Sequence, residues 1–200
     1  MKKVNVVLFD FDGTLSWPDS NIAFARYCFG HSLRPWIFLP IILGCACARY
    51  LNRRGVWWRE NVRLFLTPGL IKRLAPEFAK LHLKNRFGWA AERVAAERAA
   101  GNKVLLVSAS PDYLMNKLLG GMEFDGVLCS KTNKKKPWKY EFMCWGQNKV
   151  IALDAWAKKN KCVPHVVRAY SDSKSDMPMM EIADQQIWID PKSEWLGVSD

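Results

Sequence analysis

Two aspartates one residue apart, Asp10 and Asp12, directly follow a run of β-forming residues over 4–9. Gly13 comes next and lets the backbone turn sharply, so both carboxyl groups would stand at the end of a buried strand. Carboxylates this close repel each other, and Mg²⁺, which binds one or two carboxylates together with phosphate oxygens, would balance their charge. An ordinary strand ending in an Asp-Gly turn is the plain alternative, and the short motif alone does not exclude it.

Three later stretches carry further polar side chains after strands or at a helix start. Ser108 ends a second β-forming run, and Lys149 stands near the start of a helical pattern. Asp172 and Asp176 follow another strand. Since the carboxyl ends of parallel strands meet at one edge of a sheet, these side chains would converge on Asp10. Each alone has a bland interpretation, as a strand-end hydroxyl, one lysine of several, or a helix cap. The lysines that compete with Lys149 are Lys131, Lys134, Lys135, Lys136 and Lys139.

The order of the predicted elements indicates an α/β fold. Strands are expected at 4–9, 103–108, 126–129, 165–170 and 186–189. Helical patterns cover 22–28, 70–100 with a break near 85–88, 147–159 and 177–183, a helix opens at 109–112, and a lysine-rich loop is predicted at 131–140. Strands that alternate with helices and end in polar clusters predict a parallel sheet with its site at the strands' carboxyl ends.

Charge is unevenly distributed along the chain. The 200 residues, enough for one domain or for one core with an insertion, include 30 Lys and Arg against 19 Asp and Glu, a formal charge of +11. Between Ser20 and Pro76, nine basic residues stand against Glu60 alone. Such a surplus in one region indicates an anionic partner.

The segment Pro35–Ala48 holds fourteen residues without a charge, between Arg34 and Arg49. As one helix it would be about 21 Å long, short of the roughly 30 Å of a bilayer's hydrocarbon core, so a simple transmembrane span is not expected. Trp36 and Tyr50 stand at its two ends, and Trp57 and Trp58 follow further on. Arginines and aromatic residues at the ends are typical of an element that dips into one leaflet, and we favour this over a buried core hairpin.

The six cysteines show neither paired metal-ligand spacing nor the density of a secreted disulfide scaffold. We therefore expect reduced thiols, mostly in cores. Cys45 and Cys47 could form a metal or redox pair, but their apolar setting favours core packing. Met1, Lys2 and Lys3 run directly into the first strand without a cleavage signal, which favours a cytoplasmic location.

Together these clusters resemble the four motifs of the haloacid dehalogenase superfamily, and the resemblance covers residues 4–14 and about 103–190. In order, the clusters are Asp10/Asp12, Ser108, Lys149 and Asp172/Asp176. The resemblance implies a Rossmann-like core over 1–15 and 88–200, with a helical cap inserted at 16–87. It also implies Mg²⁺-dependent phosphoryl transfer through an aspartyl-phosphate.

The resemblance implies a catalytic or phosphate-binding role for five residues. Asp10 would be the nucleophile that attacks phosphorus. Asp12 would protonate the leaving alkoxide and then take a proton from water. Thr14, Ser108 and Lys149 would bind the phosphoryl oxygens, where the negative charge of the transition state collects.

The same resemblance implies the ligands of Mg²⁺. The carboxylates of Asp10 and Asp172 and the main-chain carbonyl of Asp12 would bind the ion directly. Asp176, one helical turn further on, would bind through water or orient the other ligands.

Within the superfamily the chain resembles the bacterial phosphatidylglycerophosphate phosphatases of the phosphoserine-phosphatase-like branch. The resemblance rests on the sequences at 170–178 and 190–194 and on a cap with an apolar segment between basic ones. It implies a membrane lipid phosphate as substrate, an anionic membrane surface as partner, and a peripheral position on the inner face of the cytoplasmic membrane. Residues 17–20 replace the glutamate-rich sequence of phosphoserine phosphatases, which argues against a free amino-acid substrate.

Other functions stay open. A soluble small-molecule phosphatase or phosphotransferase of the same superfamily would bury Pro35–Ala48 in its core. A basic nucleic-acid-binding module would use the run 131–140, with Trp138 and Tyr140 as stacking groups. Lysine runs are more often solvated loops, and attraction of an anionic substrate or membrane would explain this one. A catalytically inactive scaffold is disfavoured because no expected catalytic side chain is missing.

Overall fold

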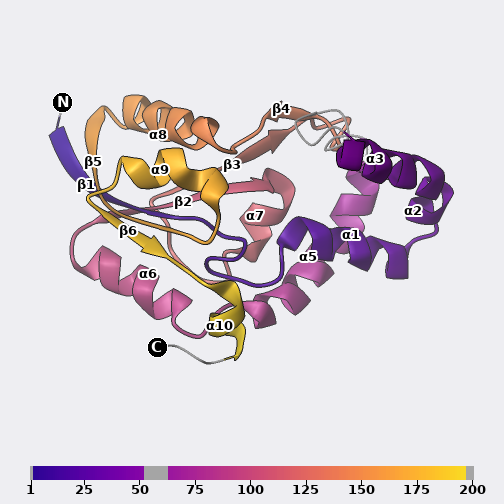
Figure 1. The fold of residues 1–200 in the computed structure, drawn as a ribbon, viewed down its shortest axis with the longest axis horizontal. Coiled ribbons are helices and arrows are strands. Elements are labelled where there is room, and N and C mark those ends of the chain that lie inside the picture. Colours follow the sequence, from indigo (N-terminus) through magenta and orange to yellow (C-terminus); the bar gives the residue numbers. More distant parts are fainter. Residues whose placement is uncertain (1, 52–62, 197–200) are drawn as a thin grey trace.

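A six-stranded sheet forms the centre of the molecule (Figure 1). The computed structural model describes residues 2–51 and 63–196. The strands are β1 (Lys2–Phe9), β2 (Lys103–Pro111), β3 (Gly126–Thr132), β4 (Tyr140–Phe142), β5 (Cys162–Ser171) and β6 (Gln185–Trp188). Their order is β4-β3-β2-β1-β5-β6, and of these strands β4 alone runs antiparallel to its neighbour. The predicted α/β fold with a largely parallel sheet is confirmed.

The first strand lies inside the sheet because its residues can be buried on both faces. Val6, Val7, Leu8 and Phe9 are fully buried, and this unbroken apolar run is typical of a parallel strand covered on both sides. The strand pairs with β2 on one side and β5 on the other. The residue that follows it, Asp10, therefore lies between the carboxyl ends of two neighbouring strands.

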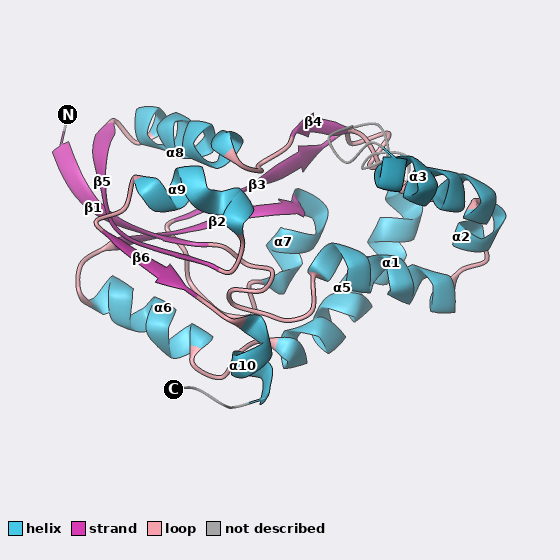
Figure 2. Cartoon of the chain, in the orientation of Figure 1, coloured by secondary structure: helices cyan, strands magenta, loops and turns pink. Residues whose placement is uncertain are grey.

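Helices cover both faces of the sheet (Figure 2). On one face pack α6 (Ala90–Ala99) and α7 (Asp112–Leu118), and on the other α8 (Gln147–Lys159) and α9 (Met177–Glu181). Two short helices complete this part of the chain, η2 (Lys174–Asp176) and α10 (Pro191–Leu196). Because crossover helices join parallel strands, the carboxyl ends of β1, β2 and β5 share one edge of the sheet.

The predicted loop at 131–140 is shorter in the structure. Thr132 pairs with Tyr140 and Lys131 with Phe142, so β3 extends beyond the expected end and β4 forms an edge strand. The lysines of this run are exposed. The pairing depends on residues across the turn, and the lysine-rich composition gave no local signal for it.

Between β1 and α6 the chain forms a helical region at the carboxyl ends of the strands, seen at the right of Figure 1. Its elements are α1 (Ser20–His31), α2 (Arg34–Ile37), α3 (Leu39–Leu51), α5 (Pro68–His82) and η1 (Leu83–Asn85). Asp19 caps α1 by accepting from the Ile22 N–H at 2.9 Å, as its sequence position predicts. Phe24 of α1 and Phe78 of α5 pack against each other with ring centres 5.1 Å apart.

The apolar segment 35–48 forms neither one continuous helix nor a fully buried hairpin. It divides at Phe38 into α2 and α3, and Cys45 is buried while Trp36, Ile37 and Leu43 are exposed. Trp57 and Trp58 lie outside the described residues, as do the side chains of Arg49 and Tyr50. Across the parts of the chain that the structure describes, no helix has the length and apolar character needed to span a bilayer.

Candidate active site

Asp10 lies in a buried charge cluster at the end of β1. Its Oδ1 accepts a 2.7 Å bond from Lys149 Nζ in the first turn of α8, and the same ammonium donates to Asp176 Oδ2 at 2.6 Å. Ser171, the last residue of β5, donates its hydroxyl to Asp176 Oδ2 at 2.7 Å. Lys149 is only 2% exposed, whereas the competing lysines at 131–139 face solvent. Tertiary structure thus selects Lys149 from the lysines that the sequence left in competition.

Thr14 and Asp172 lie on the other side of Asp10. The Thr14 hydroxyl lies 3.5 Å from Asp10 Oδ2 and 3.4 Å from Asp172 Oδ1, so the two carboxylates share one neighbouring hydroxyl. Gly13 makes this approach possible, with φ of +84° and a position where an added Cβ would lie 2.2 Å from Asp172 Oδ2. A side chain at residue 13 would therefore both strain the backbone and displace the Asp172 carboxylate.

Asp12 turns away from the Asp10–Lys149 pair towards α1 and the end of β2. Its Oδ1 accepts from the Ser20 N–H at 2.7 Å and its Oδ2 from the Ser110 hydroxyl at 2.5 Å. Ser110 in turn lies 3.0 Å from both the Ser20 hydroxyl and Asn21 Nδ2. Neither Ser110 nor Ser20 is among the site residues predicted from the sequence. The sequence signal that could have pointed to Ser110 was its position, since it is a second serine two residues after Ser108 near the end of a predicted strand.

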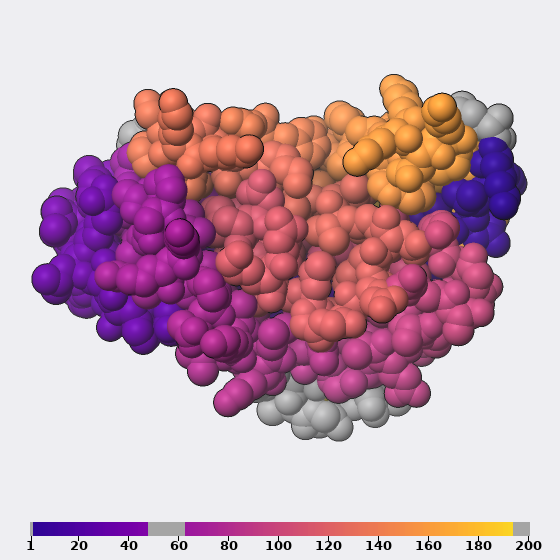
Figure 3. Space-filling view, turned by 180° about the vertical axis from the view of Figure 1, so that it is seen from behind, coloured from indigo at the N-terminus to yellow at the C-terminus, as the bar shows by residue number. Residues whose placement is uncertain are grey.

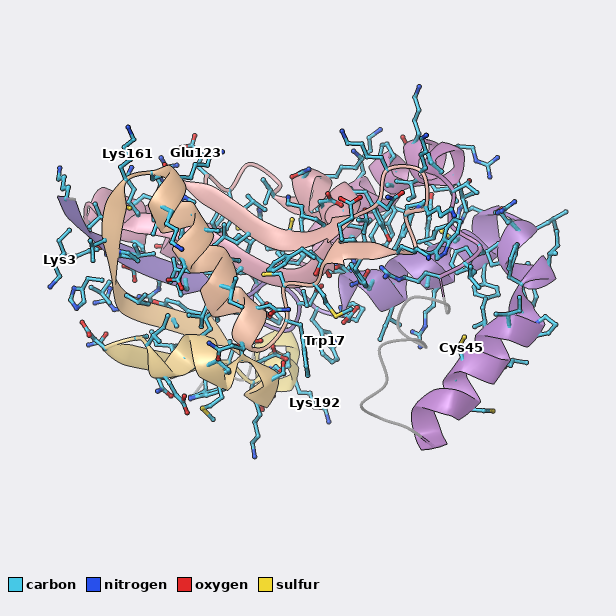
Figure 4. The ribbon with its side chains drawn as sticks, turned by 90° about the horizontal axis from the view of Figure 1, so that it is seen from above. Lys3, Trp17, Cys45, Glu123, Lys161 and Lys192 are labelled. Atoms are coloured by element: carbon cyan, nitrogen blue, oxygen red, sulfur yellow. The ribbon has the colours of Figure 1, made fainter. Side chains whose placement is uncertain are left out.

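Ser108 is 1% exposed and lies beside this network. Its Oγ accepts from the Ser110 N–H at 3.0 Å, which leaves the hydroxyl proton available to another acceptor. The predicted phosphate ligand therefore lies at the same edge of the sheet as Asp12. Trp17, on the loop after β1, lies at this end of the sheet, and Cys45 of α3 lies far from it (Figure 4).

Burial and mutual repulsion alter the acidity of the carboxyl groups. Burial raises the pKa of Asp10 to about 7, with the charge of Lys149 opposing this and that of Asp176 adding to it. Burial raises the pKa of Asp12 to about 7 as well, assisted by the charge of Asp19 and opposed by its hydrogen bond from Ser110. Two carboxyl groups near neutrality in pKa, in one buried site, suit proton transfer at physiological pH.

The pKa values of Asp172 and Lys149 are shifted as well. Burial raises the pKa of Asp172, and the charge of Asp176 acts in the same direction. Burial by itself would lower the pKa of Lys149, but the charges of Asp10 and Asp176 outweigh it and raise the pKa, so the ammonium stays charged. One ammonium among these carboxylates leaves the site short of positive charge.

The donor set fits Mg²⁺. Asp10 and Asp172 present two carboxylates on either side of the Thr14 hydroxyl, and Mg²⁺ commonly binds one or two carboxylates with water and phosphate oxygens. Among the described residues no three Asp, Glu, His or Cys side chains form a metal-ligand cluster. A cation here would therefore depend on carbonyl, water or substrate oxygens as well as these two carboxylates.

Arg63 lies where the helical region meets the β3–β4 hairpin. The residue is 7% exposed, its Nη2 donates to the Trp138 carbonyl at 3.4 Å, and its guanidinium carbon lies 4.2 Å from the centre of the Tyr140 ring. Within the described structure its buried Nη1 has no hydrogen-bond partner. Burial raises the pKa of Tyr113, three residues after Ser110, and the nearby charge of Arg63 opposes that rise.

A largely parallel sheet whose strand ends gather buried acids and a lysine defines an α/β enzyme that handles a charged substrate. Residues 7–181 match the haloacid dehalogenase-like hydrolases, and the chain belongs to that family. The expected family, the Rossmann-like fold and the hydrolase class are thereby confirmed.

Individual relatives agree with this assignment. Protein CicA of Caulobacter vibrioides is 30% identical over 202 residues, which cover 90% of this chain and 84% of CicA. A protein of unknown function from Bordetella pertussis Tohama I has the same fold, with a TM-score of 0.75, 19% identity, and 94% of this chain and 90% of that chain covered. A phosphoserine phosphatase solved with a phospho-aspartyl intermediate analogue has a TM-score of 0.59 and 19% identity, with both chains fully covered. The fold is therefore one that phosphatases use.

Proposed function

We propose that the protein is a Mg²⁺-dependent phosphomonoesterase that acts through an aspartyl-phosphate on Asp10. The observation that carries this proposal is the buried Asp10–Lys149–Asp176 cluster at the carboxyl end of β1, with Asp172 on the opposite side of Asp10. A carboxylate oxygen at this position is suited to attack a phosphoryl group, because the Lys149 ammonium offsets the repulsion between the buried carboxylates and the negatively charged phosphate.

The two aspartates of the motif would divide the chemistry. An Asp10 oxygen attacks phosphorus, the Asp10–phosphorus bond forms, and the bond to the leaving oxygen breaks. Asp12, whose pKa of about 7 keeps part of the population protonated near neutrality, gives its proton to that oxygen. Water then attacks the phosphorus of the aspartyl-phosphate, its proton passes to Asp12, and inorganic phosphate leaves Asp10.

The remaining residues would bind charge. Lys149, Ser108 and Thr14 are proposed to hold the phosphoryl oxygens, and Lys149 also balances Asp176. Mg²⁺ is proposed to bind Asp10, Asp172 and the main-chain carbonyl of Asp12, with Asp176 in its outer surroundings. The ion supplies positive charge that reduces the repulsion between Asp10 and the incoming phosphate.

For the substrate we propose a membrane lipid phosphate such as phosphatidylglycerophosphate. Residues 16–87 would form the cap that selects it, on a core of 1–15 and 88–200, with the enzyme peripheral on the inner face of the cytoplasmic membrane. Exposed apolar residues of α2 and α3 support a lipid substrate over a soluble one. The unpartnered Nη1 of Arg63 supports a substrate with a second anionic group, which the phosphodiester of such a lipid provides.

The nucleic-acid alternative has less support. Arg63 covers one face of the Tyr140 ring, which this alternative needs for base stacking, and the lysines of the run are solvated. A soluble phosphatase of the same family is the alternative that the experiment must separate.

The test measures phosphate release with Mg²⁺ from phosphatidylglycerophosphate in mixed micelles, from phosphoserine and from an aryl phosphate. We expect preference for the lipid and loss of all activity in Asp10→Asn, while Asp154→Asn, an exposed acid on α8, retains activity. Arg63→Gln should raise KM for the lipid about tenfold or more and leave the aryl phosphate unchanged. Equal or faster turnover of the soluble esters would reject the lipid substrate, and no turnover of any ester would reject the phosphatase.

A further inference from the structure

The surface of α2 and α3 exposes several large apolar side chains close together in sequence. Leu33 is 80% exposed and Ile37 74%, values that contrast with the buried Pro35 between them. We call the set the α2–α3 face; its members are Leu33, Trp36, Ile37, Ile41 and Leu43. Single exposed apolar residues are ordinary on protein surfaces, whereas five within eleven positions indicate an interaction surface.

A concavity of about 500 Å³ adjoins this face at the corner between α1 and α2. Arg34 and Arg73 line it together with Trp36 and His31. Arg34 Nε donates to the Phe65 carbonyl at 2.7 Å, and Arg73 Nη2 lies 3.4 Å from the His31 carbonyl. Each of these bonds uses one donor of a guanidinium that has five, so both arginines are oriented and keep donors for an anion.

Trp36 joins the concavity to the apolar face. Its Nε1 donates to the Phe29 carbonyl at 2.9 Å, and the two rings meet edge to face with centres 5.2 Å apart. The indole is thereby held in place although it is 55% exposed. An ordered, half-exposed tryptophan beside arginines is characteristic of residues at the boundary between lipid headgroups and acyl chains.

Charge identifies the kind of partner. Residues 20–51 and 63–76 contain no Asp or Glu, while Arg26, Arg34, Lys72 and Arg73 are exposed there. Within these described ranges the charged side chains are all positive, and an apolar surface beside them complements an anionic bilayer, whose headgroups meet the arginines while its acyl region receives the apolar side chains. These helices form one end of the molecule, in indigo and purple in Figure 3, so a flat bilayer can approach them.

We propose that the α2–α3 face docks on an anionic phospholipid bilayer and that the Arg34–Arg73 concavity binds the phosphate of a lipid headgroup. This site is separate from Asp10, since residues of α1, α2 and α5 line it and no residue of the strand ends does. The inference rests on the lipid part of the proposed function, because docking brings the site to its substrate. Bilayer phosphate bound here is not hydrolysed; it only holds the enzyme at the surface.

The test is co-sedimentation with vesicles of pure phosphatidylcholine and of equimolar phosphatidylcholine and phosphatidylglycerol. We expect the wild type to bind the anionic vesicles, less so as salt rises, and to bind the neutral ones far more weakly. Arg34→Gln and Arg73→Gln should each lower binding to the anionic vesicles about fivefold. Leu33→Asn with Ile37→Asn should lower it tenfold or more.

Matched controls use the opposite side of the molecule. Lys158→Gln and Ile151→Asn alter an exposed lysine and an exposed apolar residue of α8 and should leave vesicle binding unchanged. Thermal unfolding of every variant, compared with wild type, separates lost docking from lost folding. Equal losses in the controls and the test variants would reject the face, and so would a wild type that ignores anionic vesicles or that buries the face in a dimer.

Docking and catalysis can fail independently. A wild type that hydrolyses an aryl phosphate but does not bind anionic vesicles would reject the docking proposal and keep the phosphatase. Vesicle binding that depends on Arg34 and Arg73, in a protein that hydrolyses no ester, would keep the docking face and reject the proposed enzyme.

Discussion

The strand-end site buries charged side chains, whereas the α2–α3 face leaves apolar side chains exposed. At the strand ends, Asp10, Lys149 and Asp176 are 6%, 2% and 2% exposed, although burial of charge is costly. Leu33, just before α2, and Ile37, at its end, remain exposed although burial would stabilise them. Charged side chains are ordinarily exposed and large apolar ones ordinarily buried, so the two regions depart from this rule in opposite directions. The fold alone requires neither the buried charges nor the exposed apolar groups. The contrast is the reason we propose chemistry at the strand ends and contact with a partner at the helices.

Hydrogen bonding sharpens this contrast. The charged groups of the site are held by one another and by serines, as in the bonds from Ser171 to Asp176 and from Ser110 to Asp12. Such a network holds its carboxylates in one arrangement before substrate arrives. The α2–α3 face has no comparable demand for fixed geometry, because hydrophobic contact is non-directional.

The largest expected effect is on the nucleophile. Asp10→Asn should lower kcat by about 10⁴-fold or more, since the amide cannot form an aspartyl-phosphate. Single-turnover phosphate release with an aryl phosphate measures it, and the fold is checked by thermal unfolding. Residual activity within tenfold of wild type would show that catalysis does not take place at this end of the sheet, and the comparison of the two regions would fail.

Lys149→Ala should impair stability as well as activity. The change leaves Asp10 and Asp176 buried without their shared partner, and breaking a buried ion pair costs about 3–5 kcal/mol. Denaturant unfolding measures the loss. Lys158→Ala, which alters an exposed lysine of the same helix, should cost less than about 0.5 kcal/mol. Similar losses for the two variants would show that the ion pairs of Lys149 with Asp10 and Asp176 add no net stability.

Gly13→Ala can be compared with Gly101→Ala, because both glycines have φ near +84° while the space around them differs. An added Cβ at Gly13 would meet Asp172, whereas nothing lies within 4 Å at Gly101. Backbone strain of about 1–2 kcal/mol is expected for both, with a further loss and a strong fall in activity for Gly13→Ala alone. Equal unfolding free energies and equal activities would show that Asp172 can move without consequence.

The smallest expected effect is the pH dependence of stability that arises from His82 in the helical region. His82 of α5 is 2% exposed, its Nε2 lies 3.3 Å from the Ser16 hydroxyl, and burial lowers its pKa below the ordinary 6.5 despite the opposing charge of Asp19. The unfolded chain therefore binds this proton more tightly, so stability is retained above pH 6.5 and is lost as the pH falls below it. His82→Gln should lose less stability than wild type between pH 7 and pH 5 in unfolding experiments. Parallel pH curves would show that His82 does not titrate on unfolding.

Local sequence patterns were sufficient to predict most of the elements and the motif at the end of β1. The run before Asp10 predicts a buried strand, and the break near 85–88 predicts the separation of α5 from α6, because periodicity and glycine act over a few residues. Residue type and order likewise pointed to Asp172 and Asp176. These features depend on neighbours in sequence, so a single chain is enough to show them.

Contacts between distant segments decided the rest. The sequence did not show which lysine contacts Asp10, because the contact of Lys149 depends on α8 starting beside β1 and β5. The bond from Ser110 to Asp12 spans 98 positions, and the pairing of Lys131 with Phe142 depends on a turn that closes in space. The local sequence also could not predict that Leu33 and Ile37 are exposed, since an apolar residue is equally compatible with a core and with an interface. Composition determined which side chains were available, and tertiary packing determined which of them are buried, paired or left at the surface.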